Sequence, residues 1–553
     1  MVKGSPAFSV PSQTPGSPGR TGSRGILVIA GLLALLSVVL KAALLAVDVF
    51  PFNADEAIVA LMARHILRGE WPAFFYGQAY LGSLDPALVA AGFAAFGERV
   101  LVIRAVQTLL YAGTVFTGTL LSWRLLRSTA AAIATGMLLA IPTVNITLYT
   151  TVSIGGYGEA LLLGQCLLLL TLALLGRRRP LLYVAWGVLA GLAFWTFGLT
   201  LVYILPAGMA LAWNDLRHSD RRGRLANWGL AALGAAAGMA PWLGWAVVHS
   251  PASLIAELLG SAIAGASPGS LPQAWLEHAR NLLLLGGSVI LGFRPPWDTR
   301  WLGLPLLPFV LAIWSCVFLH AIMVLRHRDA ARTGRWMIAG VAATTVLGFV
   351  MTPFGADPSG RYFLPLGYPI AFFFGSLAAD LLPRIGRRWV AGIAALLLAY
   401  NLWGTVDSAR RNPPGLTTQF DPVARVCTGA LDDLIAFLQA NGEKAGYSNY
   451  WVAYPLAFLS EEHLVFVPRL PYHEDFRYTP RDNRYPPYNG VVAGSDRAAF
   501  ITTNHPALDA RLRAEFARLG VGFREATIGG FHVFYRLSGR VTPEMLGLPA
   551  EGK

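Results

Sequence analysis

Charged residues and cysteines are both scarce in this chain of 553 residues. Only 14% of the residues are charged, whereas soluble domains average about 25%, and 55% of the residues are hydrophobic. Cys166 and Cys316 lie inside apolar runs and only Cys427 lies outside them, so no disulfide framework is available. The composition therefore indicates that lipid surrounds most of the chain.

The polar part of the sequence also lacks several motifs of soluble enzymes. It contains no glycine-rich loop of the nucleotide-binding type, no paired-cysteine metal site and no nucleophile elbow, which argues against an enzyme that uses a nucleotide sugar. The net charge of +13 is spread in short clusters between apolar runs, so it does not indicate a nucleic-acid partner. We interpret these basic clusters as determinants of membrane topology.

About eleven apolar runs have the length expected of membrane spans. They lie at 26–48, 101–123, 129–148, 158–176, 181–197, 199–213, 226–248, 303–325, 337–352, 362–382 and 389–404. Clusters of Lys and Arg fall on alternate loops, which places those loops and the N-terminus on the cytoplasmic side. This topology requires the segment 181–213 to be a hairpin of two short helices that is broken near Phe197.

The sequence predicts three parts. Residues 1–25 are expected to be a disordered basic cytoplasmic tail, 26–404 a polytopic α-helical membrane domain, and 405–553 a small α/β soluble domain on the external or periplasmic side. In the last part, helical patterns at 428–440, 450–459 and 506–519 alternate with strand-like runs. These runs lie at 464–467, 499–502 and 531–535.

Two external loops, 49–100 and 249–302, are long enough to suggest a function. The first has two helical patterns, 57–68 and 84–96, which we expect to lie at the membrane surface and to be joined by an aromatic stretch. The second contains an apolar stretch, 281–293, that is too short to cross the bilayer, so we expect a re-entrant or interfacial segment.

Acidic residues lie at the external mouths of two spans. Asp55 and Glu56 follow the first span directly, and ionisable groups at such a boundary are candidates for function. They could instead belong to a helix cap formed with Asn53. Glu159 opens the fourth span after a glycine-rich stretch, and it could equally stabilise the positive end of that helix.

Two arginines face the same compartment as these acids. Arg361, which begins the tenth span, and Arg294, which precedes the eighth, could bind phosphate in a bidentate manner. They could also anchor the chain at the interface beside tyrosine and tryptophan. The remaining candidate substrate-binding residues are Gln78, Tyr80, Tyr157 and Tyr362.

The first long loop resembles that of membrane glycosyltransferases of the GT-C superfamily. The resemblance is to the bacterial branch related to protein O-mannosyltransferases and aminoarabinose transferases. It rests on Asn-Ala-Asp-Glu-Ala at 53–57, Phe-Tyr-Gly-Gln at 75–78 and Gly-Ser-Leu-Asp at 82–85, and it extends over 26–404 with Gly-Gly-Tyr-Gly-Glu at 155–159 and Gly-Arg-Tyr at 360–362.

The resemblance implies an enzyme that transfers a sugar from a polyprenyl-phosphate donor, with inversion, to a glycan, lipid or protein acceptor at the external face. It implies that Asp55 is the general base and that Glu56 helps to position the acceptor. A phosphate leaving group departs as an anion, so no second carboxylate is needed as an acid. No cofactor is required on this basis, although Asp85 and Glu159 are possible ligands of a divalent metal.

The chain departs from the aminoarabinose-transferase pattern because it has no Lys-Pro-Pro segment in the first loop. Ser83, Leu84, Asp85 and Pro86 stand there instead, which puts a lipid A acceptor in doubt. A polytopic transporter is the alternative, but transporters place charges and helix breaks at the midplane in paired repeats, which this sequence does not show. A polymerase or ligase of lipid-linked glycans would usually carry its large loop late in the chain.

Overall fold

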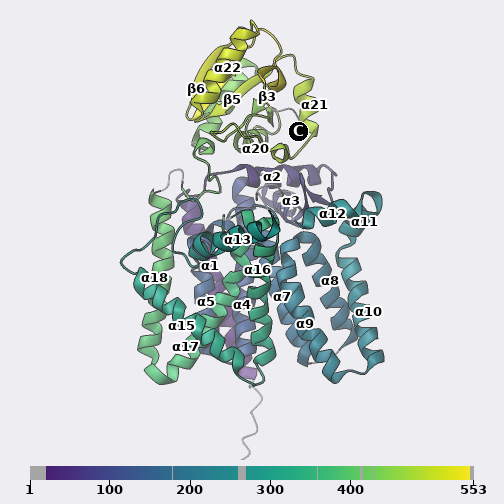
Figure 1. Ribbon diagram of the computed structural model, residues 1–553, viewed down its shortest axis with the longest axis vertical. Coiled ribbons are helices and arrows are strands. Elements are labelled where there is room, and N and C mark those ends of the chain that lie inside the picture. Colours follow the sequence, from purple (N-terminus) through teal and green to yellow (C-terminus); the bar gives the residue numbers. More distant parts are fainter. Residues whose placement is uncertain are drawn as a thin grey trace, which may run out of the picture.

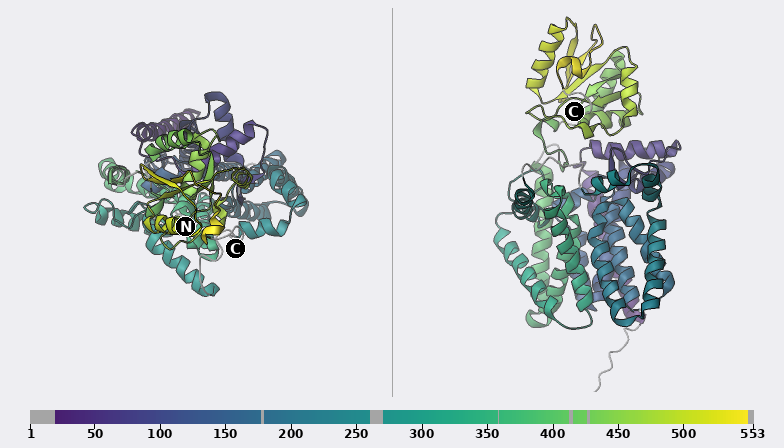
Figure 2. Two further views of the ribbon diagram at one scale, coloured as in Figure 1. Left: turned by 90° about the horizontal axis from the view of Figure 1, so that it is seen from above. Right: turned by 45° about the vertical axis from the view of Figure 1, so that its right-hand side comes forward.

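The protein has three layers in the computed structural model. The structure describes residues 20–176, 179–259, 270–357, 359–411, 415–425 and 428–548. Residues 1–19 of the expected tail, Cys427 and 260–269 of the second long loop lie outside the described residues. A helical bundle occupies the lower part of Figure 1, a domain with a sheet stands above it, and α2 (Ala54–Leu67), α12 (Pro251–Leu258) and α13 (Leu271–Arg280) lie across the bundle between them. Figure 2 shows the same stacking from two further directions.

The chain is a multi-pass membrane protein. Among the described residues, eight helical segments are long and apolar enough to cross a membrane, and one further pair passes the same test but is bent by 70°. The segments lie in α1 (Arg20–Ala46), α4 (Val100–Leu126), α7 (Tyr157–Gly176), α9 (Leu201–His218), α15 (Leu307–Arg326), α16 (Arg332–Met351), α17 (Gly367–Ile385) and α18 (Arg387–Arg411). The bent pair is α10 (Arg221–Gly238) and α11 (Ala240–Val248), and the apolar helices α5 (Thr129–Ala140) and α8 (Pro180–Thr196) are shorter. The total of eleven spans stays a prediction.

The hairpin expected over 181–213 has its break where the sequence places it. Helix α8 ends at Thr196, Phe197 has extended backbone, and α9 follows a single 3-10 turn. Phe197 forms an isolated β-bridge with Leu81, so the break lies on the face of the bundle that carries the first long loop.

The first long loop contains the two predicted surface helices, α2 and α3 (Leu84–Phe96). The aromatic stretch between them forms an antiparallel hairpin of β1 (Phe74–Phe75) and β2 (Gln78–Gly82). Helix α2 is buried along nearly its whole length, because α3 covers one side and α20 (Tyr450–Leu459) of the sheet domain covers another. The helix carries Asp55, Glu56, Arg64 and His65 among its apolar residues, so this enclosure brings charged side chains into the contact between the bundle and the sheet domain.

The apolar stretch of the second long loop does not cross the bundle. After α13 it forms a π-helical turn, Asn281–Gly286, and the short helix α14 (Gly287–Ile290). This agrees with the expectation of an interfacial segment.

The C-terminal domain has a five-stranded mixed sheet in the order β4-β3-β5-β7-β6. Strands β3 (Ala445–Ser448), β4 (Val465–Pro468) and β5 (Ala499–Thr503) are parallel, and β6 (Arg524–Ile528) and β7 (Phe531–Tyr535) add antiparallel pairs at one edge. Its main helices are α19 (Leu431–Asn441), α20, α21 (Pro487–Ala493) and α22 (Pro506–Arg518). Side chains at the carboxyl ends of parallel strands commonly form binding sites, and here the end of β3 leads directly into α20, which faces the bundle.

Candidate active site

The first turn of α2 carries both acidic residues of the candidate site. Asn53 caps this helix, and its side-chain oxygen accepts a hydrogen bond from the Glu56 amide at 3.1 Å. The predicted cap is therefore present, but it uses Asn53 and leaves both carboxylates for other contacts. Negative charge is favoured at this end of a helix by the macrodipole.

Glu56 points into the protein and is fully buried. Arg104 of α4 donates to both of its carboxylate oxygens at 3.0 Å, and the Asn53 amide lies 3.3 Å from one of them. Burial raises the pKa of Glu56, and the charge and hydrogen bonds of Arg104 oppose this shift. The ion pair fixes the first turn of α2 against the bundle, and it occupies the oxygens that would contact an acceptor.

Asp55 points the other way, toward the sheet domain, and is half-buried. Its Oδ1 accepts a hydrogen bond of 2.5 Å from the hydroxyl of Tyr450. Asp482 and Arg484 of the same domain lie within electrostatic reach of this carboxylate. Burial raises the pKa of Asp482 to about 7, and Arg484 opposes the rise while Asp55 adds to it.

Arg484 connects the sheet domain to the hairpin of the first loop. With the Gln78 amide oxygen facing it, the guanidinium donates two hydrogen bonds to that oxygen, at 2.6 and 3.0 Å, and the Tyr80 hydroxyl donates a third at 3.0 Å. The guanidinium also lies over the ring of Tyr450, 5.7 Å from its centre. Gln78, Tyr80 and Asp55 are thus brought together by a residue that is distant in sequence.

Arg361 supplies a second positive charge next to Tyr80. It forms an ion pair of 2.5 Å with Asp357, and its guanidinium lies 5.1 Å from the ring centre of Tyr362. The charges of Arg361 and Arg484 both act on the buried Tyr80 hydroxyl, so the two guanidiniums flank it. Protein surrounds Arg361, yet 32% of its side chain is exposed, and its Nε has no hydrogen-bond partner among the described residues. A buried donor without a partner is available to a ligand.

Tyr157 and Tyr362 lie on the bundle side of the same region. Their ring centres are 6.3 Å apart, and the charge of Arg361 acts on both hydroxyls. Both side chains are buried. They form the floor beneath Tyr80 and Arg361.

Arg294 has a different environment. Its guanidinium donates to the carbonyl oxygens of Leu285 and Asp298, at 3.0 and 2.9 Å, and to the hydroxyl of Ser288 at 2.8 Å. These contacts fold the loop that follows α14. Arg294 thus stabilises this loop, and it lines a cavity together with Asp357, the ion-pair partner of Arg361.

Glu159 is buried beside Asp85, so the structure joins the first loop to the start of α7. Gln107 donates to one oxygen of Asp85 at 2.8 Å and Ser153 donates to the other. Burial raises the pKa of Asp85. The Glu159 carboxyl group lies next to this network, and neither of its oxygens has a hydrogen-bond partner among the described residues.

Asp85 and Glu159 do not make a suitable metal site. Both oxygens of Asp85 already accept hydrogen bonds, and hard cations need six or more oxygen ligands. Within the part of the chain that the structure describes, no three His, Cys, Asp or Glu side chains lie close enough together to hold a metal ion. We derive no step through a metal.

An apolar cavity of about 240 Å³ opens beside this region. Helices α9 and α16 form its walls, the end of α12 contributes Leu258, and Tyr80 and Tyr362 lie at its polar end. Tyr362 lines the cavity, and the Arg361 guanidinium lies 5.1 Å from the centre of its ring. The cavity therefore runs from the lipid-facing helices to the neighbourhood of this guanidinium.

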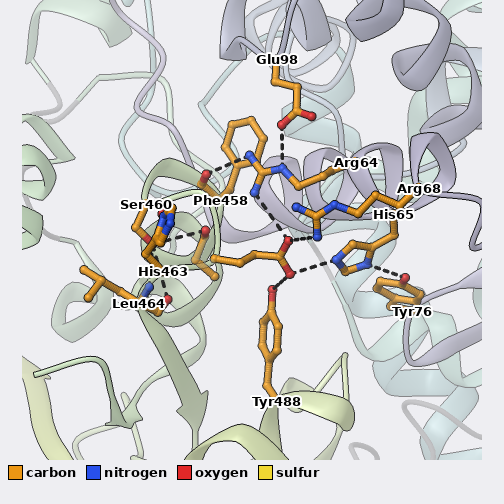
Figure 3. Close-up of polar contacts among 12 residues, drawn as sticks. Arg64, His65, Arg68, Tyr76, Glu98, Phe458, Ser460, His463, Leu464 and Tyr488 are labelled. Carbon is orange, nitrogen blue, oxygen red and sulfur yellow. Dashed lines mark hydrogen bonds and ion pairs between the residues drawn. The ribbon is translucent and has the colours of Figure 1, made fainter.

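A cluster of ionic contacts, the α2 clamp, holds the sheet domain on α2 (Figure 3). Glu462 accepts hydrogen bonds from His65 at 2.9 Å, from Arg68 at 2.7 Å and from Tyr488 at 2.9 Å, and Arg64 donates to the Phe458 carbonyl at 3.1 Å. Burial raises the pKa of Glu462, but the contact with His65 and the further donors outweigh it and lower the value to about 2. The clamp uses the same helix that carries Asp55.

Sequence reasoning did not include the residues that the sheet domain contributes to this site. Tyr450 lies in no recognisable motif of the predicted soluble domain, and Asp482 and Arg484 lie in a polar stretch that has none either. The sequence shows only that Tyr450 begins a predicted helix after a polar stretch. This does not identify Asp55 as its partner.

Similarity to known proteins is found among solved structures. No protein-family model matches the chain, and no curated protein matches it in sequence. ArnT from Cupriavidus metallidurans, solved in the apo state and bound to undecaprenyl phosphate, has TM-scores of 0.57 and 0.55 and identities of 15% and 14%. Each of these alignments covers 93% of this chain and 98% of that one.

The archaeal oligosaccharyltransferase AglB from Archaeoglobus fulgidus, in complex with an inhibitory peptide and a dolichol-phosphate, is also similar. Its TM-score is 0.54 at 13% identity, over 94% of this chain and 75% of that one. These proteins are members of the GT-C superfamily. At such identities the shared feature is the fold, so this chain has the GT-C fold, with a small sheet domain after the bundle.

Proposed function

We propose that this protein is a membrane glycosyltransferase that moves a sugar from a polyprenyl-phosphate donor to an external acceptor. The observation that carries the proposal is the convergence of a carboxylate, two guanidiniums and an apolar cavity at one face of a GT-C bundle. The neighbours ArnT and AglB were solved with undecaprenyl phosphate and a dolichol-phosphate, which supports a lipid-linked donor.

The donor would bind with its phosphate at the guanidiniums and its hydrocarbon chain along the cavity. Arg361 has a free Nε and an exposed edge, and the charge of Arg484 also acts on Tyr80. Charge-assisted hydrogen bonds from guanidinium to phosphate are among the strongest polar contacts in proteins. We assign this role to Arg361 and Arg484, and we assign Arg294 to the folding of its loop.

The transfer is a single displacement at the anomeric carbon. The acceptor atom attacks this carbon while the bond to the phosphate oxygen breaks, and Asp55 takes the proton that the acceptor loses. The bonding electrons leave with the lipid phosphate, where positive charge stabilises them. One displacement inverts the configuration, and no acid is needed because the leaving group departs as an anion.

The neighbouring residues support these steps. Gln78 and Tyr80 would orient the donor between the two guanidiniums, and Tyr157 and Tyr362 would close the site toward the bundle. Glu56 would position Asp55 by holding the first turn of α2 on Arg104, in place of a direct contact with the acceptor. Asp85 would hold the first loop on α4 through Gln107, with Glu159 buried beside it at the start of α7.

The experiment is a transfer assay with reconstituted protein and a panel of radiolabelled polyprenyl-phosphate sugars. Asp55→Asn removes the base but keeps the shape and the hydrogen-bond acceptor, so transfer should fall by about 100-fold or more. Asp475→Asn, at an exposed position of the sheet domain, is the matched control and should retain wild-type activity.

Retention of activity in Asp55→Asn would show that another group, Glu56 or Glu159, accepts the proton. Absence of transfer from every donor by the wild-type protein, under conditions in which it remains folded, would contradict the proposed function itself.

A further inference from the structure

We infer that Tyr450 of the sheet domain is a positioning residue for the base. Its hydroxyl holds Asp55 Oδ1 and leaves Oδ2 for the acceptor proton. This inference rests on the proposed function and adds to it that the sheet domain completes the catalytic centre.

The hydrogen bond between Tyr450 and Asp55 joins two elements that are both held firmly. The hydroxyl lies 2.5 Å from Oδ1, and only 4% of Tyr450 is exposed. Burial, and then the nearby charge of Asp55, raise the pKa of Tyr450 well above its usual value, so the hydroxyl keeps its proton and acts as the donor. A short bond between a phenol and a carboxylate is expected to be strong.

Tyr450 is fixed in place by the start of α20. Asn449 caps this helix, accepts a hydrogen bond from the Trp451 amide at 3.0 Å and donates one to Thr503 of β5 at 2.8 Å. The Tyr450 ring contacts the rings of Trp451 and Tyr454, with centres 5.1 and 5.6 Å apart. The sheet therefore determines where the hydroxyl lies.

The same helix positions the arginine that acts on the other side of Asp55. The Tyr454 hydroxyl accepts a hydrogen bond from the Arg484 amide at 2.5 Å and donates one to the Asp482 carbonyl at 3.0 Å. Through Tyr450 and Tyr454, α20 thus holds both the base and the loop of Arg484. A movement of the sheet domain would displace both groups together.

Tyr450 is one of several polar groups that face Asp55. The others are Glu56 on the same helix, Tyr149 of α6 (Val144–Tyr149), and Tyr472, Asp482 and Arg484 of the sheet domain. Among them, Tyr450 has the hydrogen bond to the carboxylate. Its removal should therefore free Oδ1 and slow the transfer step, while the groups assigned to the donor stay in place.

The test is Tyr450→Phe, which removes one oxygen and preserves the ring. We expect kcat to fall about tenfold or more, since a hydrogen bond to a charged group contributes about 1.5–3 kcal/mol. The KM for the donor should change less than about twofold. A merely structural role would not produce this combination.

Tyr488→Phe is the matched control, because it removes a buried hydroxyl that donates to a carboxylate of the α2 clamp instead. It should leave kcat and the donor KM within about twofold of the wild type. Replacement of Tyr450 by 4-fluorophenylalanine fills the space of the hydroxyl but cannot donate, so it should lower kcat in the same way even if the phenylalanine variant folds poorly.

The two proposals fail in different ways. If Asp55→Asn is inactive while Tyr450→Phe keeps the wild-type kcat, the enzyme class stands and the inference about Tyr450 is wrong. If the wild-type protein transfers no sugar, the proposed function fails first.

Discussion

Asp55 and Glu56 are neighbours in sequence, yet their side chains reach different partners. One faces the sheet domain and bonds to Tyr450, and the other is buried against Arg104 of the bundle. Successive residues on a helix point about 100° apart, so one turn can supply both an anchor and a reactive group. Loss of one partner of a buried ion pair costs about 3–5 kcal/mol of stability. The pair of Glu56 and Arg104 is therefore a strong anchor for the first turn of α2.

The arginines offer a prediction at the same scale. Arg361→Gln should raise the donor KM about tenfold or more, because it removes a charge-assisted contact to phosphate that contributes about 1.5–3 kcal/mol. Arg294→Gln should lower thermal stability and leave the donor KM within about twofold, because that guanidinium bonds to its own loop. Donor titrations on both purified variants provide the comparison, and a rise in KM for Arg294→Gln alone would reverse the assignment.

Sequence alone located one half of the candidate site. A charge at the mouth of a span is costly, so Asp55 could be singled out from its position after α1. Tyr450 and Arg484 could not be assigned, because their role depends on how the sheet domain docks, and no local pattern encodes that contact. The burial of Glu56 is not predictable either, because its partner Arg104 lies near the start of α4 and no local pattern links the two residues.

At the scale of elements, the strongly periodic segments were predicted and the weakly patterned ones were not. Helices α2 and α3, the break at Phe197 and strands β4, β5 and β7 follow from hydrophobic runs of the right length. Strand β3 contains Ala, Gly and Ser, which have low strand propensity, and it is a strand because β4 and β5 pair with it on both sides. The polar strand β6 lies at an edge.

The α2 clamp gives a prediction about acid. Because the pKa of Glu462 is lowered from 4.5 to about 2, its contribution to docking is complete above about pH 4.5 and is lost as the pH falls toward 2. Glu462→Gln should therefore unfold at a lower temperature than the wild type at pH 6 to 8. This difference in Tm should shrink below pH 4.5.

The measurement is the thermal unfolding of detergent-solubilised protein across that pH range. Asp475→Asn, whose carboxylate is exposed, should match the wild type throughout. A difference between Glu462→Gln and the wild type that is independent of pH would show that shape, and not charge, holds the domains together.

At the scale of the whole molecule, the proposed topology places the sheet domain outside the cytoplasm. In a cysteine-free background, an impermeant maleimide should label Asp475→Cys in intact cells. It should label Arg328→Cys, between α15 and α16, only after the membrane is permeabilised. The opposite pattern would put Asp55 in the cytoplasm and exclude an external transfer site.

The contact between Asp55 and Tyr450 spans 395 positions of the chain. The base is therefore synthesised near the beginning, whereas the tyrosine that holds it is made only after the last helix of the bundle. A ribosome-bound intermediate that has inserted all of its helices still has an incomplete catalytic centre. On the proposed function, unfinished chains that lack the sheet domain would therefore be poor consumers of lipid-linked sugar while they wait in the membrane.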